Sequence, residues 1–477
     1  MPIHFPALRF GKPYKSLDLI DLTPLQSENI IAQVSQVNAG IIKRDLRKIH
    51  EAQAALAQHT TDELIEMCAK AGKIFTTDTL PVGDGDETQA PEEYIKSLSS
   101  TTGLPYTLCR YNMGKIEHVL SNLSLILKGL TRGLPTTIFD DNIITVQGID
   151  VCYFPTANSI GTVLPSNAPA VNSLWAPAIA MKVPVILKPG REDPWTPFRL
   201  IQALTKAGLP AEAFGFYPTT HEGADTILNT CSRGIAFGGD DTVKKYEANP
   251  NISCHGTGRS KVLIGDDLVD DWPELVDALV TSLSANSGRS CICASTIITP
   301  RHGDEIAKAV AEKLAEIQPL APDDENAKLS GFANPAMADW IDGKLEEGLQ
   351  EGGATDISAP LRGDTPRKVE QFGQNFLHPT VVRCDNIDHP LAKTEFLFPY
   401  AAVVEMPQED MLANIGPSLV ISAFTKDQAW INQLLRSQDI DRLNTGVMPT
   451  CQVQWEQPHE GNLFEFLYHR RAIQRAS

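Results

Sequence analysis

From about residue 143 onward, short apolar runs alternate with amphipathic helical segments, and this alternation constrains the fold more than any other feature of the sequence. Residues 183–189 (VPVILKP) are predicted to form a short buried strand, residues 197–207 a helix, and residues 233–239 a second apolar strand that runs into glycines. Strands that alternate with helices build a mainly parallel sheet. The alternation restarts after about residue 256, so the sequence predicts an α/β fold with two α/β domains.

The N-terminal part of the chain is predicted to be mainly helical. In residues 26–57, apolar side chains recur at helical spacing, which predicts one long amphipathic helix. Thr60 opens a capping-box pattern that predicts the start of a second helix. Residues 80–92 (LPVGDGDETQAPE) carry the turn formers and acids of an exposed loop, and a strand pair is predicted around Gln147 and Gly148.

Charge and hydropathy argue against several classes of partner. The 477 residues carry a net charge of −18, from 41 basic and 59 acidic side chains, which disfavours nucleic acid and anionic membrane as partners. No apolar run approaches the roughly 20 residues that span a bilayer. Residues 1–15 lack the apolar segment of a secretory leader, so we expect a cytoplasmic protein with no membrane span.

Nine cysteines are scattered from Cys68 to Cys451 without the spacing of metal ligands, which predicts reduced thiols and no metal site. Cys291 is placed differently from the others, because it follows a glycine turn between a predicted helix (272–284) and a predicted strand (295–299). A thiolate at such a position can attack a carbonyl carbon and later leave as a thioester is cleaved. Burial as a small apolar side chain is the commoner fate of a cysteine, and the spacing alone leaves both interpretations open.

The segment from Asn286 to Cys291 (NSGRSC) resembles the nucleophile motif of the aldehyde dehydrogenase superfamily, Asn-x-Gly-Gln-x-Cys, with Arg289 in place of the glutamine. The resemblance implies that Cys291 is the catalytic nucleophile and that Cys293 serves packing. LPSNAP (164–169) is similar to the family's Pro-Trp-Asn-Phe-Pro segment, which makes Asn167 the amide that stabilises the oxyanion. Without the family, an Asx turn beside proline would be the preferred reading of Asn167.

The same resemblance implies a dinucleotide cofactor, NADP or NAD. Lys188 falls on the family's ribose-binding lysine, and Arg191 replaces a glutamate that accepts from the 2′-hydroxyl, which favours a 2′-phosphate. A solvated surface arginine is an equally good reading of Arg191. IAFGGDDTVKKY (235–246) resembles the turn whose helix N-terminus faces the pyrophosphate. The cofactor-binding candidates are therefore Lys188, Arg191, Gly238, Gly239, Asp240 and Glu395, the last on the acid that holds the nicotinamide ribose.

One departure from the family bears on the reaction. The Glu-Leu-Gly-Gly-Lys segment that carries the hydrolytic base is replaced by HGTGRSK (255–261), so His255 stands at the glutamate position. Members that exchange acyl groups with coenzyme A commonly lack that glutamate, and the acyl-CoA reductase branch is the first reading of this chain. Ordinary aldehyde oxidation with His255 as the base, a non-catalytic nucleotide-binding role, and a structural turn histidine remain alternatives.

The resemblance also implies a domain organisation. A dinucleotide-binding domain is expected at 1–133 and 156–255, a bridging β-element at 134–155, and a catalytic domain at 256–448. The C-terminal tail, 449–477, lacks the family's Pro-Phe-Gly-Gly-x-Lys segment. The expected partner is a small-molecule aldehyde or acyl-CoA as substrate, and the expected assembly is a homodimer or homotetramer.

Overall fold

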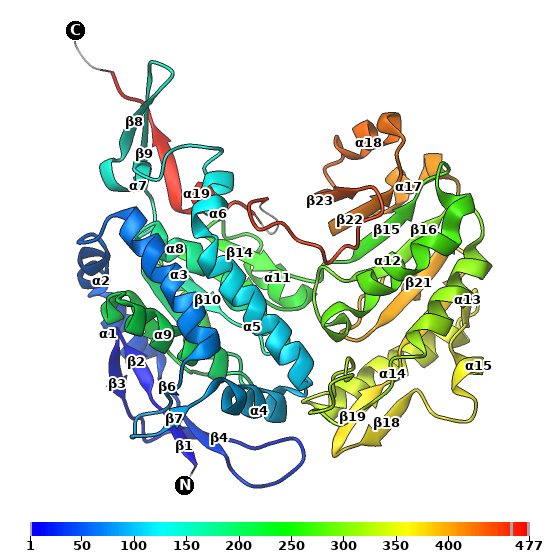
Figure 1. Cartoon of the computed structure of the whole chain (residues 1–477), viewed down its shortest axis with the longest axis horizontal. Coiled ribbons are helices and arrows are strands. Elements are labelled where there is room, and N and C mark those ends of the chain that lie inside the picture. The colour runs from blue at the N-terminus through cyan, green and yellow to red at the C-terminus, as the bar shows by residue number, and fades with distance from the viewer. Residues whose placement is uncertain (1, 458–460, 475–477) are drawn as a thin grey trace. The chain divides into compact units, whose positions relative to one another are not determined.

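The computed structural model describes residues 2–457 and 461–474, and the chain divides into two compact units (Figure 1). The first unit comprises Met1–Thr102, Cys109–Gly256 and Gln454–Ser477, and the second comprises Gly103–Leu108 and Thr257–Val453. Each unit contains a seven-stranded sheet with helices packed on it, so the predicted α/β fold with two α/β domains is confirmed.

The sheet of the first unit is mainly parallel. Its strands, in spatial order, are β14 (Ile252–His255), β13 (Arg233–Phe237), β10 (Ile160–Val163), β11 (Val185–Lys188), β12 (Phe214–Phe216), β2 (Ala7–Arg9) and β3 (Lys12–Tyr14). Strands β10 to β14 run parallel, and β2 pairs antiparallel with β12 and β3. After β10 the chain builds outward through β11 and β12, then returns to the other side of β10 to form β13 and β14. The strand order therefore reverses between β10 and β13, where open α/β sheets place their ligands.

Helices cover this sheet, and local sequence fixes their ends. Helix α3 begins after Thr60, whose side chain and that of Glu63 form the predicted capping box, and it packs along α9. Helix α9 ends at Gly208, which has a φ of 118° that suits glycine. The helices of this unit are α1 (Ala39–Leu46), α2 (Ile49–Leu56), α3 (Thr61–Thr77), α4 (Pro91–Thr102), α5 (Tyr106–Ser121), α6 (Leu123–Leu130), α7 (Ile138–Asp141), α8 (Ala176–Ala180), α9 (Trp195–Ala207), α10 (His221–Thr230), α11 (Asp240–Tyr246) and α19 (Leu463–Leu467).

The long helix predicted over residues 26–57 is wrong. The segment forms strand β5 (Ala32–Ser35), which lies between β1 (Ile3–Phe5) and β4 (Leu19–Leu22), and then the two short helices α1 and α2. Asn38 starts α1, because its side-chain oxygen accepts from the Ile41 N–H at 3.0 Å. Val34 is one of the apolar residues that gave the segment its helical spacing, but it is buried on strand β5, in register with Phe5 of β1. Residues 80–92 also contain a short hairpin, β6 (Leu80–Pro81) with β7 (Thr88–Gln89).

The second unit is built on a sheet with apolar side chains on both faces. In spatial order its strands are β17 (Ala354–Asp356), β20 (Thr380–Cys384), β21 (Tyr400–Glu405), β16 (Ala294–Thr299), β15 (Ser260–Ile264), β22 (Ser418–Phe424) and β23 (Ile440–Thr445), and only β17 is antiparallel. Along β21, Ala402 and Val404 enter one core while Ala401 and Val403 enter the other. This alternation with a period of two explains why the strand at 400–405 is a continuous apolar run.

Helices α12 (Trp272–Ser284) and α13 (Gly303–Leu314) cover one face of this sheet (Figure 1). The other face is covered mainly by α14 (Pro335–Gln350), α16 (Pro390–Lys393), α17 (Gln408–Asn414) and α18 (Gln428–Leu434). A short helix, α15 (Ala359–Arg362), and the two-stranded sheet of β18 (Lys368–Gln371) and β19 (Gln374–Leu377) complete the unit.

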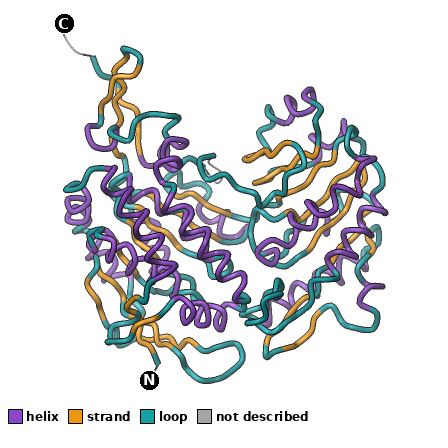
Figure 2. Tube along the Cα trace, in the orientation of Figure 1, coloured by secondary structure: helices purple, strands orange, loops and turns teal. Residues whose placement is uncertain are grey.

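A small three-stranded antiparallel sheet belongs to the first unit, and Figure 2 shows its strands extending beyond the helices of that unit. The predicted strand pair around Gln147 and Gly148 is confirmed as β8 (Ile143–Val146) and β9 (Ile149–Pro155). The sequence did not predict the third strand, β24 (Tyr468–Arg471), which pairs with β9. Most of β24 is exposed and charged, so it lacks the apolar alternation that identifies a strand.

Candidate active site

The candidate site residues fall into two groups, one in each unit. Cys291 and Glu395 belong to the second unit. The first unit contains the other candidates, which are Asn167, Lys188, Arg191, Gly238, Gly239, Asp240 and His255.

The turn that precedes Cys291 has a strained backbone. Asn286, Ser287 and Gly288 have φ values of 49°, 58° and 65°, and the left-handed region is unfavourable for residues other than glycine. Ser287 is held there because its hydroxyl accepts from the Ser330 N–H at 2.8 Å. A Cβ at Gly288 would lie 2.4 Å from the backbone of Phe398, so no other residue fits. Strain of this kind collects at functional sites, where the surrounding structure enforces it.

Cys291 and Cys293 have different environments. Cys291 is partly exposed, and its carbonyl accepts from the Ser260 hydroxyl at 2.7 Å. Gly258 packs against the same carbonyl so closely that a Cβ there would lie 2.0 Å from the oxygen. Cys293 is buried, and its thiol donates to the Ala285 carbonyl at 3.1 Å. A partly exposed cysteine on a tightly held backbone suits a nucleophile, and the buried Cys293 suits a packing residue.

Arg289, which replaces the family's glutamine, lies inside the second unit. Its guanidinium donates to the Gly331 carbonyl and lies 5.6 Å from the centre of the Phe332 ring. Burial lowers the pKa of Arg289 to about 10, which still leaves it charged near neutral pH. The side chain therefore supports the nucleophile turn from within.

Glu395 lies just beyond α16, and its carboxylate accepts from the Arg259 N–H at 2.6 Å. Burial raises the pKa of Glu395 to about 7, against the opposing effects of the Gly258 and Arg259 amides and the Arg259 and Lys261 charges. A carboxylate that backbone amides hold in place can accept a hydrogen bond from a hydroxyl group such as that of a ribose.

In the first unit, candidate residues stand at the carboxyl ends of strands on both sides of the strand-order reversal. Val163 at the end of β10 is in register with Lys188 on β11 and with Ala236 on β13. Asn167, partly buried, follows β10, and Gly238 follows β13. Burial lowers the pKa of Lys188, and the nearby Glu192 opposes that shift.

These residues fit a nucleotide. Gly239 is exposed, and a Cβ built on it would meet no atom within 4 Å, which leaves open space beside the turn. Lys188 supplies a cation at a strand end. Arg191 is exposed, and its guanidinium pairs with no other residue in the described part of the chain, so it is available to a phosphate. Asp240 and Asp241, both exposed in the first turn of the seven-residue helix α11, are unfavourable for a phosphate.

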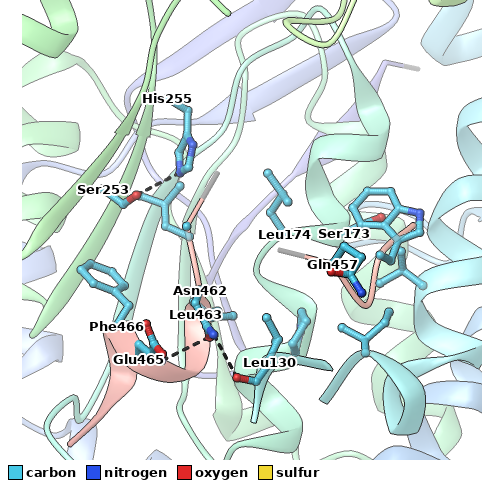
Figure 3. Close-up of a pocket in the computed structure, with 16 residues that line it drawn as sticks. Leu130, Ser173, Leu174, Ser253, His255, Gln457, Asn462, Leu463, Glu465 and Phe466 are labelled. Carbon is cyan, nitrogen blue, oxygen red and sulfur yellow. Dashed lines mark hydrogen bonds between the residues drawn. The ribbon is translucent and has the colours of Figure 1, made fainter. Parts of the chain in front are cut away.

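His255 ends β14, and its ring is held by two contacts, of which Figure 3 shows the hydrogen bond to Ser253. Its ring stacks on Phe237, its neighbour in register on β13, with centroids 4.9 Å apart and planes at 24°. Its Nε2 shares a 3.2 Å hydrogen bond with the Ser253 hydroxyl. His255 therefore has a defined orientation rather than that of a mobile turn side chain.

His255 and Ser253 line a pocket of ≈ 360 Å³ whose walls all come from the first unit. Its other lining residues are Val119, Ile126, Leu130, Ser173, Leu174, Pro177, Ile235, Trp455, Gln457, Gly461, Asn462, Leu463, Glu465 and Phe466. Asn462 ties the tail to the pocket wall by donating to the Leu130 carbonyl at 2.9 Å. Sequence reasoning missed these wall residues, because they come from distant segments. The only signal was the departure of the tail from the family pattern.

Within residues 2–457 and 461–474, the structure contains neither a candidate metal site nor a candidate membrane-spanning helix. No group of three or more metal-ligating side chains occurs among them, and none of their helices is long and apolar enough to cross a membrane. None of the nine cysteines, all of which lie in this range, is in a disulfide.

Comparison with known proteins places these observations in context. The model of the aldehyde dehydrogenase family matches residues 20–416. A Staphylococcus haemolyticus protein, provisionally named as an aldehyde dehydrogenase, is 22% identical over 452 residues, covering 90% of this chain and 87% of its own. An indole-3-acetaldehyde dehydrogenase solved with NAD⁺ superposes with a TM-score of 0.81 at 15% identity, covering 99% of this chain and 96% of its own. An NADP-dependent Escherichia coli enzyme gives a TM-score of 0.76 at 14% identity, covering 99% and 98%.

Proposed function

Because the chain belongs to the aldehyde dehydrogenase family, we propose that it is a nicotinamide-dependent oxidoreductase that interconverts an aldehyde and an acyl-CoA. The proposed reaction passes through a covalent thioester on Cys291. Support comes from the strained, tightly held turn that presents the partly exposed Cys291, and from the nucleotide-compatible strand ends of the first unit.

Each residue has a defined role in the proposal. The Cys291 thiolate adds to the carbonyl carbon, and the electron pair of the carbonyl moves to its oxygen. The Asn167 amide and the Cys291 N–H donate to that oxyanion. Lys188, Arg191, Gly238, Gly239, Asp240 and Glu395 hold the dinucleotide. When bound, the nicotinamide would accept a hydride in the oxidation of the aldehyde to the acyl level, or donate one in the reverse reaction.

The proposal that coenzyme A rather than water accepts the acyl group depends on His255. A thioester reacts slowly with water unless a positioned base takes the proton, whereas a coenzyme A thiolate is itself a good nucleophile. The His255 ring stacks on Phe237 of β13 and shares a hydrogen bond with Ser253 of β14. These contacts fix the ring, which is also shorter than the glutamate side chain that serves as the base in hydrolytic members of the family. The pocket beside His255, which lies within the first unit, has a volume in the range that binds small organic groups, and several aliphatic side chains line it.

Ordinary oxidation of an aldehyde to an acid is the second candidate. It is favoured by one observation: the His255 ring lines the pocket and shares a hydrogen bond with Ser253, as a base would need. The names of the relatives, which are aldehyde dehydrogenases, agree with it. A non-catalytic nucleotide-binding role is disfavoured by the accessible Cys291 on its enforced turn.

The proposal extends to domain roles and assembly. The first unit would bind the dinucleotide, and the second would supply the nucleophile. The small sheet of β8, β9 and β24 would serve assembly into a homodimer or homotetramer, since β8 is an open edge and Ile149 on β9 is 62% exposed.

The proposed function is tested by following nicotinamide absorbance while the enzyme meets NADPH or NADH and a panel of acyl-CoAs. We expect oxidation of the reduced cofactor that depends on the acyl-CoA and releases aldehyde and coenzyme A in equal amounts. Absence of turnover with every acyl-CoA, together with rapid oxidation of aldehyde to acid, would contradict the proposal and support ordinary aldehyde oxidation instead.

Arg191→Glu is expected to weaken NADP(H) binding by about tenfold or more, because a charged hydrogen bond to the 2′-phosphate is lost and an acid replaces it. Binding of NAD(H) should change little or improve. Titrations of both cofactors check this, with Arg436→Glu, another exposed arginine, as the control. A wild type that prefers NAD(H) and a variant with the same preference would remove Arg191 from the site.

His255→Gln is expected to leave the coenzyme-A-dependent rate within about one order of magnitude, since the proposal gives His255 little base work on that route. The measurement is the steady-state rate with and without free coenzyme A, with the exposed His221→Gln as the control. Loss of a fast, coenzyme-A-independent acid release in His255→Gln would contradict the proposal.

A further inference from the structure

Arg259 adopts a backbone conformation that an arginine does not favour. Its φ is 44°, in the left-handed region where a Cβ is crowded. Both sides of this residue are used: its N–H donates to Glu395 at 2.6 Å, and its carbonyl accepts at 2.6 Å from the ammonium of Lys261. The conformation is therefore held by contacts at both ends of one residue.

Lys261 is an unusual residue for this position. It lies on β15 in the sheet core with 4% of its surface exposed, where a charged amine is costly to bury. Its ammonium donates to the Arg259 carbonyl and, at 2.8 Å, to the Ser418 hydroxyl. Ser418 in turn donates to the Gly416 carbonyl at 3.0 Å, so the lysine is anchored to the start of β22.

The segment from Gly258 to Lys261 joins the surroundings of Cys291 to those of Glu395. Gly258 packs on the Cys291 carbonyl, and the Ser260 hydroxyl donates to that same carbonyl. The Gly258 carbonyl accepts from the Leu419 N–H at 2.8 Å, which fixes the segment to β22. A change in the Arg259 peptide would therefore move the amides that hold Glu395.

We propose that Lys261 is a positioning residue: its ammonium holds Arg259 in the left-handed conformation and so orients the Glu395 carboxylate toward the nicotinamide nucleotide. This inference rests on the proposed function, in which Glu395 binds that nucleotide. Lys261 itself touches neither substrate nor cofactor in this account. Its positioning effect passes through the Arg259 carbonyl and peptide to the Glu395 carboxylate, and its charge acts on the same carboxylate.

Electrostatics adds a signature that packing alone would not give. The charges that face Glu395 are those of Arg259 and Lys261, and both lower its pKa against the effect of burial. Removing the Lys261 charge should therefore raise the pKa of Glu395 above its present value of about 7. Nucleotide binding would then need a higher pH to reach its full strength, because the ionised carboxylate would form later as pH rises.

The test compares nicotinamide nucleotide binding, measured by quenching of protein fluorescence, in wild type, Lys261→Met and Lys344→Met. Lys344 is an exposed lysine of α14 and serves as the matched control. We expect the dissociation constant to rise about tenfold in Lys261→Met only, the effect of one charged hydrogen bond, with its pH profile displaced upward. Ser418→Ala, which keeps the charge and loses one anchor, should give a smaller rise of about threefold.

A double-variant cycle makes the inference specific to the Arg259 backbone. Glycine adopts the left-handed conformation without crowding, so Arg259→Gly should no longer need the lysine. We expect Lys261→Met to cost about tenfold with arginine at 259 and less than about threefold in the Arg259→Gly background. Equal costs in both backgrounds, or unchanged binding in a folded Lys261→Met, would overturn this inference alone. A wild type that binds no nicotinamide nucleotide would overturn the proposed function and this inference together.

Discussion

Cys291→Ala is expected to abolish turnover with every aldehyde and acyl-CoA, because the proposed covalent thioester forms on the Cys291 thiolate. Removal of a catalytic nucleophile leaves only the rate that binding and oxyanion stabilisation provide. The fold should survive, since Cys291 is partly exposed and alanine removes only its thiol. Steady-state rates and thermal unfolding of the same preparation check both parts of the expectation.

The matched control is Cys293→Ala, two residues further along the chain. Its thiol is buried and donates to the Ala285 carbonyl, so its loss should cost stability more than activity. An active Cys291→Ala beside an inactive but folded Cys293→Ala would show that the nucleophile has been placed two residues too early.

Asn167→Ala is expected to lower kcat by about 10²–10³, the usual effect of losing one oxyanion donor. The Michaelis constant should change much less, because the donor acts on the charge that develops in the transition state. Rates at saturating substrate measure this directly. Asn229→Ala, which removes an exposed asparagine of α10, is the control.

Asn167 also has a purely structural reading as the residue of a turn beside proline. A structural role predicts a lower melting temperature with kcat nearly unchanged in the folded protein. That pattern would remove Asn167 from the oxyanion site while leaving the role of Cys291 intact.

Much of the fold could be predicted from the sequence, because buried parallel strands are continuous apolar runs. The apolar run at 183–189 contains β11, and the helix at 272–284 was predicted with the bounds that the structure gives. The prediction for residues 26–57 was wrong because helical spacing of apolar residues does not exclude a strand, and because Asn38 caps the start of a separate helix within the segment. Strand β24 failed because its exposed, charged face carries no alternation.

The candidate site was predictable only where residue types follow a local order. The segment around Cys291 is of that kind, and its assignment remains a proposal. The roles of Ser253 beside His255, and of Lys261 beside Arg259, depend on hydrogen bonds and on one backbone angle. Neither has a counterpart in sequence spacing, since the same lysine would be read as an ordinary residue of a strand. The residues of the pocket wall could not be predicted for a related reason, because α6 and the C-terminal tail are far apart in the sequence and meet only in the fold.

In the proposed reaction, Cys291 carries an acyl group that coenzyme A removes. The most direct measurement incubates the enzyme with an aldehyde and oxidised nicotinamide cofactor in ¹⁸O-labelled water, with and without coenzyme A, and follows intact protein and products by mass spectrometry. We predict an acyl adduct on the peptide that contains Cys291, which persists without coenzyme A and disappears as acyl-CoA forms when it is added. Rapid release of ¹⁸O-labelled acid without coenzyme A, with no adduct at Cys291, would contradict the account.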